Sequence, residues 1–231
     1  MIALCIPSRG LVFSRCMQAA IEGMQALNAV GVATIFCYTH NLPIPDCHNA
    51  CVEKALSNQA VTKIFFLEED MYIDPQTFVA LATSDYDIAT VQYNDRNGSV
   101  NGIIHRNEQG EILWSGLGAT VVKRAVFEAL GKPYFRIDHR YKSTKSAGPN
   151  GAIVTQFEEL EPRQEWDQEK NEFVTVRDSY KYGGLDVDFY TRARQLGYKI
   201  EALPEYKAHQ FVLVALGEVA NNNGCHEIRQ V

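Results

Sequence analysis

Short apolar runs alternate with helical patterns along the first hundred residues. Residues 2–7, 32–38 and 64–67 are mainly apolar runs, each bounded by polar or turn-forming residues. Runs of this length predict β-strands that are buried on both faces. Apolar positions recur at helical spacing over 16–27 and again after Asp46, which predicts two helices between the strands, the second of them capped by Asp46. The β-α-β-α-β order predicts a parallel sheet with right-handed crossovers and helices on both faces.

The remainder of the chain has shorter elements. In chain order we expect a helix over 75–82, a strand over 88–93, a hairpin of 102–105 and 111–114, a strand over 119–122 and a helix over 124–130. Residues 132–183 differ in character, because they combine many charges with a Gly-Pro-Asn-Gly turn and only two strand-like runs. Such a long segment near the end of an α/β unit predicts a functional or mobile insertion, with a passive surface excursion as the alternative.

Three acidic residues end the third strand. Glu68, Glu69 and Asp70 directly follow its apolar run, and Asp74-Pro75 then predicts a capped helix start. Ligands of open α/β sheets bind at the carboxyl ends of the strands. We therefore expect Glu68 and Asp70 to offer a pair of hard oxygen ligands for Mg²⁺ or Mn²⁺ holding a diphosphate. The alternative is a solvated acidic loop.

Composition narrows the class of protein. The chain has 231 residues, 46% of them hydrophobic, and a formal net charge of −6, with 28 acidic against 22 basic residues. The negative charge argues against a protein that binds mainly through nucleic-acid phosphates. No apolar run reaches the length of a membrane span and no signal peptide is recognised, so we expect a cytoplasmic protein.

Cysteine and glycine patterns exclude several kinds of site. The six cysteines form no C-x-x-C pair, which favours free thiols in a reducing compartment. Cys47, His48 and Cys51 resemble metal ligands, but no second ligand pair stands at zinc-finger spacing. Neither a G-x-G-x-x-G nor a P-loop follows the first strand. A bound nucleotide must therefore be held in another way.

The stretch 182–200, YGGLDVDFYTRARQLGYKI, carries a family resemblance. It resembles the second signature of family 2-like glycosyltransferases with the GT-A fold, in which a Glu-Asp pair opens a helix that ends in Gly-Tyr-Lys-Ile. Asp186 matches the Asp of that pair, whereas Leu185 stands where the family has Glu. The family's Asp-x-Asp after the central strand is matched by Glu68-x-Asp70, and His48-Asn49 replaces its Arg-Asn element.

The resemblance implies a fold and a set of roles. It implies an α/β, GT-A-like (Rossmann-like) single domain over 1–231, with a mostly parallel central sheet flanked by helices and a small antiparallel or irregular insertion at 132–183. Residues 1–100 would form the nucleotide-sugar-binding half and residues 101–231 the acceptor-side half. The implied catalytic base is Asp186, the metal ligands are Glu68, Asp70 and His209, and the donor-binding residues are Pro7, Ser8, Arg9, Thr39, Asn49 and Glu69.

The implied reaction suits these residue types. A departing nucleoside diphosphate develops negative charge that a divalent ion stabilises, and a carboxylate can take the proton of an acceptor hydroxyl. We expect metal-dependent, inverting sugar transfer from a nucleoside-diphosphate sugar. The acceptor stays open between a saccharide, a protein, a lipid carrier and a modified nucleic-acid base. A sugar nucleotidyltransferase and a non-catalytic nucleotide-sugar- or carbohydrate-binding module are the alternatives, while His209 has the further alternative of a packed core histidine.

Overall fold

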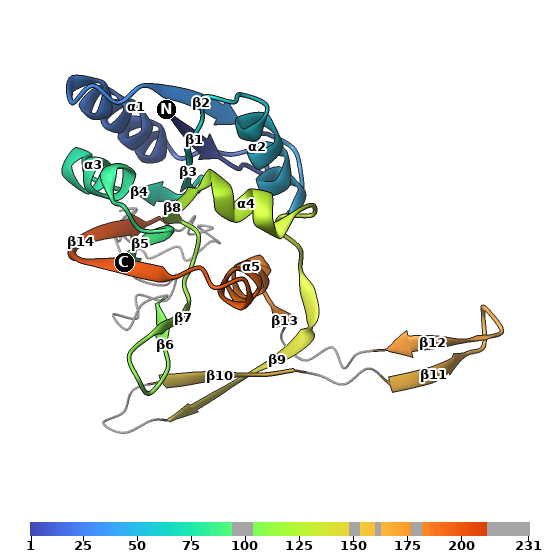
Figure 1. Cartoon of the computed structure of the whole chain (residues 1–231). Coiled ribbons are helices and arrows are strands. Elements are labelled where there is room, and N and C mark those ends of the chain that lie inside the picture. Colours follow the sequence, from blue (N-terminus) through green and yellow to red (C-terminus); the bar gives the residue numbers. More distant parts are fainter. Residues whose placement is uncertain (94–103, 148–152, 160–162, 177–181, 212–231) are drawn as a thin grey trace, which may run out of the picture.

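A computed structural model describes residues 1–93, 104–147, 153–159, 163–176 and 182–211 of the chain (Figure 1). The helices are α1 (Ser14–Ala29), α2 (Asp46–Leu56), α3 (Pro75–Thr83), α4 (Arg124–Leu130) and α5 (Leu185–Gln195). The strands of the body are β1 (Ile2–Ile6), β2 (Thr34–Tyr38), β3 (Lys63–Leu67), β4 (Met71–Tyr72), β5 (Ile88–Tyr93), β6 (His105–Arg106), β7 (Ile112–Trp114), β8 (Ala119–Lys123) and β14 (Ile200–Gln210).

Seven strands form one mixed sheet in the order β2-β1-β3-β8-β5-β14-β4. The β1, β2 and β3 strands are parallel, as predicted, and β5 pairs in parallel with β14. The β8 strand lies antiparallel between β3 and β5, and the two-residue β4 pairs antiparallel with the end of β14. The parallel order brings the carboxyl ends of β1, β2 and β3 to one edge, where the predicted site residues follow them.

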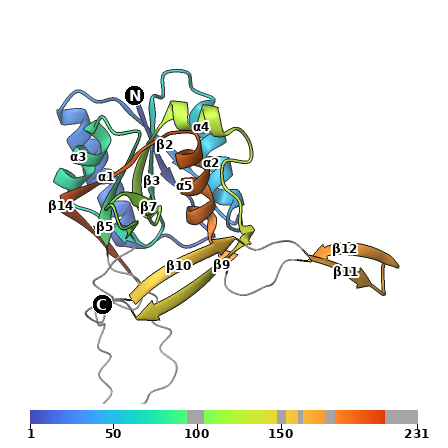
Figure 2. The same ribbon diagram turned by 60° about the horizontal axis from the view of Figure 1, so that its bottom comes forward.

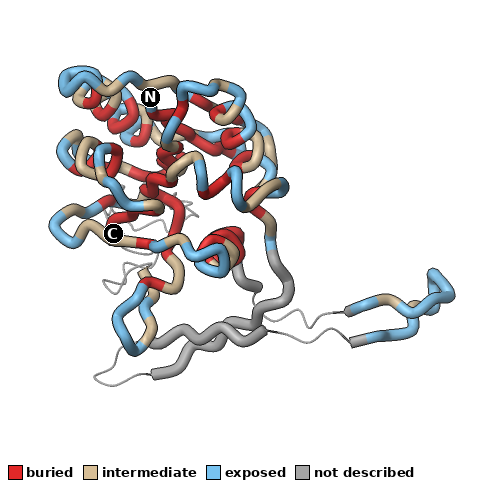
Figure 3. Tube along the Cα trace, viewed as in Figure 1, coloured by how far each residue is buried: buried red, intermediate tan, exposed pale blue. Residues whose placement is uncertain are grey.

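The sheet separates two hydrophobic cores. Residues of β1 and β3 alternate between them, so that Leu4 and Phe65 contact the core under α1 and α3 while Cys5 and Phe66 contact the core under α2, α4 and α5. This alternation explains the uninterrupted apolar runs, because both faces of each strand are covered (Figure 3). At Gly23 of α1, an added Cβ would lie 2.2 Å from the Phe78 ring, so glycine permits α1 to pack closely on α3.

Helix starts and the sheet edge differ in detail from the sequence expectations. Asp74 caps α3 as predicted, because its carboxylate accepts hydrogen bonds from the Gln76 and Thr77 backbone N–H groups. The expected Asp46 cap is wrong, since the α2 cap position is Pro45. The β2 strand is only partly buried because it is the outer strand of the sheet.

The insertion forms ribbons outside the main sheet. Its strands are β9 (Asp138–Ala147), β10 (Ile153–Glu159), β11 (Arg163–Asp167), β12 (Glu172–Val176) and β13 (Tyr182–Gly183). The β9 strand pairs with both β10 and β13, and β11 pairs with β12 in a separate hairpin. Figures 1 and 2 both show this hairpin extending away from the body of the molecule. Within the described ranges, no helix is both long and apolar enough to cross a membrane.

Candidate active site at the carboxyl edge of the sheet

The acidic turn after β3 is held by backbone hydrogen bonds from three other elements. Glu68 N–H donates to the Gly118 carbonyl oxygen before β8 at 3.0 Å, and Phe13 N–H donates to the Glu69 carbonyl at 2.9 Å. On the other side, Phe211 N–H donates to the Asp70 carbonyl at 2.7 Å. The turn is thereby fixed relative to α1, β8 and β14. Its acidic side chains are positioned by a rigid scaffold, which favours ligand binding with little reorganisation.

Glu69 forms the most strongly bonded carboxylate of the turn. Its Oε2 accepts hydrogen bonds from Ser8 Oγ at 2.8 Å and Arg9 N–H at 2.9 Å, while its Oε1 lies 2.7 Å from Arg9 Nη2. Burial alone would raise the pKa of Glu69, but the hydrogen bonds from Ser8 and Arg9 outweigh it and lower that pKa. Glu69 therefore joins the turns that follow β1 and β3.

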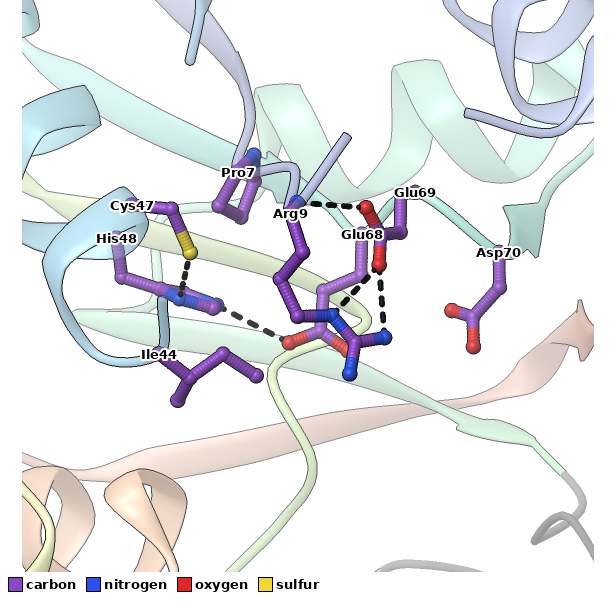
Figure 4. Close-up of a pocket in the computed structure, with 8 residues that line it drawn as sticks. All are labelled: Pro7, Arg9, Ile44, Cys47, His48, Glu68, Glu69 and Asp70. Atoms are coloured by element: carbon purple, nitrogen blue, oxygen red, sulfur yellow. Dashed lines mark hydrogen bonds and ion pairs between the residues drawn. The ribbon is translucent and has the colours of Figure 1, made fainter. Parts of the chain in front are cut away.

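Glu68 is bonded to a buried histidine that sequence reasoning did not include among the site residues. His48 Nε2 lies 3.1 Å from Glu68 Oε1, and His48 Nδ1 lies 3.3 Å from Cys47 Sγ (Figure 4). Because His48 is only 2% exposed, its ring is fixed in place on the first turn of α2. The sequence signal was its place in the His48-Asn49 pair at the start of the helix after the second strand, but its partner Glu68 is evident only from the structure.

These side chains line a small pocket with a volume of about 30 Å³. Its lining residues come from the ends of β1 and β3 and from the start of α2 (Figure 4): Pro7, Arg9, Ile44, Cys47, His48, Glu68, Glu69 and Asp70. Five of the predicted residues, Pro7, Arg9, Glu68, Glu69 and Asp70, therefore meet at one place, and Ser8 is connected to them through Glu69. The pocket is lined by polar side chains that include both acidic and basic groups.

Asp70 contacts the last strand of the sheet, but not through the predicted histidine. Gln210 Nε2 donates a hydrogen bond to Asp70 Oδ2 at 3.0 Å. His209 precedes Gln210 on β14, pairs with Tyr72 in register, and is exposed, with its ring centroid 6.4 Å from that of Tyr72. Successive residues of a strand point to opposite faces, so Gln210, rather than His209, takes the position next to Asp70.

Asp186 is brought close to Glu68 by the start of α5. Burial, followed by the negative charge of Glu68, raises the pKa of Asp186 to about 8. An aspartate at the helix cap would instead have a lowered pKa, because the helix dipole favours the ionised carboxylate. The α5 cap is Gly184 and Asp186 lies inside the first turn, where burial and the charge of Glu68 together outweigh the helix dipole. The predicted base and a predicted metal ligand thus interact, although they are far apart in sequence.

Asp188 has a different environment two residues later on the same helix. Its side chain is fully buried and lies 2.8 Å from both Arg136 Nε and Arg192 Nε. Arg192 Nη2 also donates to the Tyr134 carbonyl at 2.5 Å. Asp188 therefore connects α5 to the first residues of the insertion. Leu185, which stands where the resembled family has Glu, is buried in the core under α5.

Two predicted donor-binding residues have structural partners. Thr39 Oγ1 donates to the Cys47 carbonyl at 3.2 Å, so the residue after β2 holds the first turn of α2. The Asn49 side chain bonds the backbone of Phe135 twice, donating to its carbonyl at 2.7 Å and accepting from its N–H at 2.9 Å. Neither residue lines the small pocket. Asn49 instead fixes residue 135, near the start of the insertion.

The donor set of the edge fits a divalent cation held jointly by protein and substrate. In the part of the chain that the structure describes, no group of three or more His, Cys, Asp or Glu side chains is arranged to hold a metal ion. Glu68 and Asp70 supply two hard oxygen donors at one pocket. Mg²⁺ commonly takes one or two carboxylates and completes its shell with substrate phosphates and water. A site closed entirely by protein ligands does not fit these residues.

Comparison with known proteins supports the fold. Neither a protein-family description nor a curated protein matches the sequence. Among solved structures, protein A197 from STIV aligns with a TM-score of 0.52 at 19% identity, over 91% of this chain and 85% of that chain.

Two further structures are similar at a lower level. A Drosophila β-1,4-galactosyltransferase 7 in complex with manganese, UDP-Gal and xylobiose gives a TM-score of 0.45 at 12% identity, over 87% of this chain and 63% of that one. The inositol-1-phosphate CTP transferase from T. maritima gives 0.43 at 12% identity, over 91% and 88%. The similarity to A197 supports the predicted α/β fold, in which a central, mostly parallel sheet carries helices on both faces.

Proposed function

We propose that this protein is a glycosyltransferase that moves a sugar from a nucleoside-diphosphate sugar to an acceptor hydroxyl, with inversion and with Mn²⁺ or Mg²⁺. The observation that carries the proposal is the meeting of Arg9, Glu68 and Asp70 in one pocket at the carboxyl edge of the sheet. Asp186 lies near enough for the charge of Glu68 to raise its pKa. The pocket offers paired oxygen donors in Glu68 and Asp70 and a cation in Arg9, and we take Asp186 as the acid–base group. Such a set suits the departure of a diphosphate and the deprotonation of an alcohol.

Each group has a defined task in this proposal. Glu68 and Asp70 would hold the divalent cation, which supplies charge stabilisation for the leaving diphosphate when bound. His48 fixes Glu68 through its 3.1 Å contact, and Gln210 fixes Asp70 at 3.0 Å. Ser8, Arg9 and Glu69 form a connected wall on the donor side. We assign donor binding to residues 1–100 and acceptor binding to residues 101–231.

Asp186 is the proposed base for the acceptor hydroxyl. A carboxylate with a pKa of about 8 has a greater affinity for a proton than an ordinary aspartate, so once ionised it is a stronger base. A carboxylate oxygen of Asp186 accepts the proton of the acceptor hydroxyl. The hydroxyl oxygen bonds to the anomeric carbon of the sugar as the bond from that carbon to the diphosphate breaks. His209, Thr39 and Asn49 are not needed for this scheme. The five free cysteines among the described residues agree with a proposed cytoplasmic location, where thiols stay reduced.

The test is the identity of the released product. The protein is incubated with Mn²⁺ and a panel of nucleoside-diphosphate sugars, and release of the nucleoside diphosphate is measured with and without pooled mono- and oligosaccharide acceptors. We expect one donor to release its diphosphate, faster with an acceptor. Pyrophosphate release from a nucleoside triphosphate and a sugar phosphate would instead make the protein a nucleotidyltransferase. Donor binding without any release would make it a binding module.

A further inference from the structure

The β11–β12 hairpin presents an aromatic pair to solvent. Trp166 is 50% exposed and Phe173 is 68% exposed, although large aromatic side chains are usually buried. The hairpin extends from the body and most of its described residues are exposed (Figure 3). Its exposed rings lie far from the hydrophobic cores of the sheet, which do not include them.

The two rings form an ordered surface. Trp166 and Phe173 are directly opposite in the strand register, with ring centroids 5.0 Å apart and planes at 74°. The next pair on the same face is Gln164 and Thr175, two residues along each strand from the aromatic pair. These two side chains are joined by a 2.8 Å hydrogen bond. Alternation places Glu165 on the opposite face. One face thus combines two aromatic rings with an amide and a hydroxyl, a surface that we name the Trp166–Phe173 platform.

The turn of the hairpin is fixed as well. Asp167 Oδ1 accepts hydrogen bonds from Glu169 N–H at 2.9 Å and Lys170 N–H at 3.1 Å. Asn171 completes the turn with a φ of 54°, a conformation that asparagine tolerates better than most residues. The two strands are therefore held in register by the turn and by the ring pair. A cross-strand aromatic pair does stabilise a hairpin, but that role leaves the outward ring surfaces exposed.

The size of the platform argues against a protein partner. A stable protein interface buries about 800 Å² on each side. A whole aromatic side chain offers on the order of 150–250 Å², and here two rings are only partly exposed. The platform is therefore too small for a protein interface on its own. It matches a ligand with the width of one or two small rings.

The charge of the hairpin narrows the chemistry of that ligand. Residues 163–176 contain four acidic and two basic side chains, so the hairpin is net negative. Nucleic acids, phosphate-linked lipid carriers and acidic glycans are repelled by such a segment. A neutral sugar has an apolar C–H face that stacks on aromatic rings and hydroxyl groups that bond to amide and hydroxyl side chains. The platform offers both kinds of contact.

We propose that the Trp166–Phe173 platform binds a neutral saccharide chain as the acceptor, an inference that rests on the proposed sugar-transfer function. The chain path supports this assignment. The same insertion returns through β13 directly to Gly184 and α5, which carries Asp186. Sugar units bound at the platform would add affinity for a long acceptor whose end reacts at the sheet edge. The acceptor alternatives of a protein, a lipid carrier and a nucleic-acid base become outcomes to be excluded.

Trp166 fluorescence provides a direct test. The chain has two tryptophans, so the Trp114→Phe variant leaves Trp166 as the single reporter. This variant is titrated with soluble hydroxyethyl cellulose, xylan, mannan and glycogen in separate experiments. We expect at least one polysaccharide to change Trp166 emission with saturation, and the same polysaccharide to retard the wild-type protein in affinity electrophoresis. If none of the four polysaccharides changes the emission or retards the protein, the proposal that the platform binds saccharides is wrong.

Substitutions then locate the binding. Trp166→Ala and Phe173→Ala should each reduce the retardation at least tenfold, and Trp166→Phe should keep most of it because a ring remains. Tyr86→Ala, which removes a 45% exposed aromatic from the loop after α3, is the matched control and should leave it unchanged. Equal retardation of all variants, or self-association that is lost with the rings, would contradict the inference.

A donor titration of the wild-type protein separates the two proposals. A polysaccharide bound at Trp166 by a protein that binds no nucleotide sugar would overturn the proposed function and leave a carbohydrate-binding platform. Donor-dependent product release without polysaccharide binding would leave the transferase and remove the platform.

Discussion

Two aspartates in the first turn of α5, Asp186 and Asp188, have opposite electrostatic surroundings. Asp188 is fully buried and is compensated by two arginines at 2.8 Å. Asp186 lies on the side of the sheet edge, and its pKa is raised to about 8 by burial and then by the charge of Glu68. The compensated carboxylate ties elements together. Asp186 keeps a high proton affinity, which suits the base that we propose, so in this proposal the balance of nearby charge separates a structural acid from a functional one.

The largest expected effect is the loss of turnover when the Asp186 carboxylate is replaced. Asp186→Asn should lower the turnover of nucleotide-sugar donor by about 10²–10⁴-fold, because the amide cannot accept the acceptor proton. Donor affinity should be retained, since the donor does not contact this group in the proposal. Steady-state rates and donor titrations measure the two separately. A rate equal to that of the wild type would remove Asp186 from the reaction.

The compensated acid should affect stability instead. Asp188→Ala leaves two arginines without their buried partner and should lower the free energy of unfolding by about 3 kcal/mol. Urea denaturation at pH 7 measures the loss. Asp186→Asn in the same experiment is the matched comparison and should not be destabilised. Equal destabilisation by both substitutions would show that the two sides of α5 do not differ as argued.

The free energy of unfolding should also depend on pH, with opposite sign for Asp186, whose pKa is raised, and Glu69, whose pKa is lowered. The folded state holds the Asp186 proton up to about pH 8, whereas the unfolded state loses it near 3.8, so this contribution is lost as the pH rises between those values. Asp186→Asn should therefore be more stable relative to the wild type at pH 8 than at pH 5. The lowered pKa of Glu69 acts conversely, because its contribution is present above about 4.5 and is lost in acid.

Thermal unfolding of the wild type, Asp186→Asn and Glu69→Gln across pH 3–8 measures both slopes. Glu69→Gln should lose its difference from the wild type toward the acid end. A pH-independent difference between the wild type and Asp186→Asn would contradict the raised pKa.

Much of the central sheet follows from local sequence pattern. The apolar runs predict β1 and β3 because both faces of these strands are covered, and Asp74-Pro75 predicts the start of α3 because a cap and a pre-set φ act locally. The strand over 119–122 was predicted and is confirmed as β8, but its antiparallel placement could not be derived in this way. Its place between β3 and β5 depends on long-range pairing, which strand composition alone does not encode.

The site was predictable to the extent that it lies at strand ends. Glu68, Glu69 and Asp70 follow a buried strand, and parallel order then brings Ser8 and Arg9 beside them. The partners from elsewhere were not predictable, because they depend on tertiary contacts. His48 reaches Glu68 from α2, and Gln210 is chosen over His209 by strand register. Residues 102–103 of the predicted hairpin lie outside the described residues.

The most direct test of the central claim is a thermal-shift measurement of metal-dependent donor binding. Wild-type protein, Asp70→Asn and the exposed control Asp85→Asn are heated with each nucleotide sugar, with and without Mn²⁺. A donor at a hundredfold excess over its Kd stabilises the folded state by about 2.7 kcal/mol. We predict that Mn²⁺ and one donor together raise the melting temperature of the wild type and of Asp85→Asn, but not of Asp70→Asn. An equal, metal-dependent rise in all three would contradict the assignment of the acidic edge as the donor site.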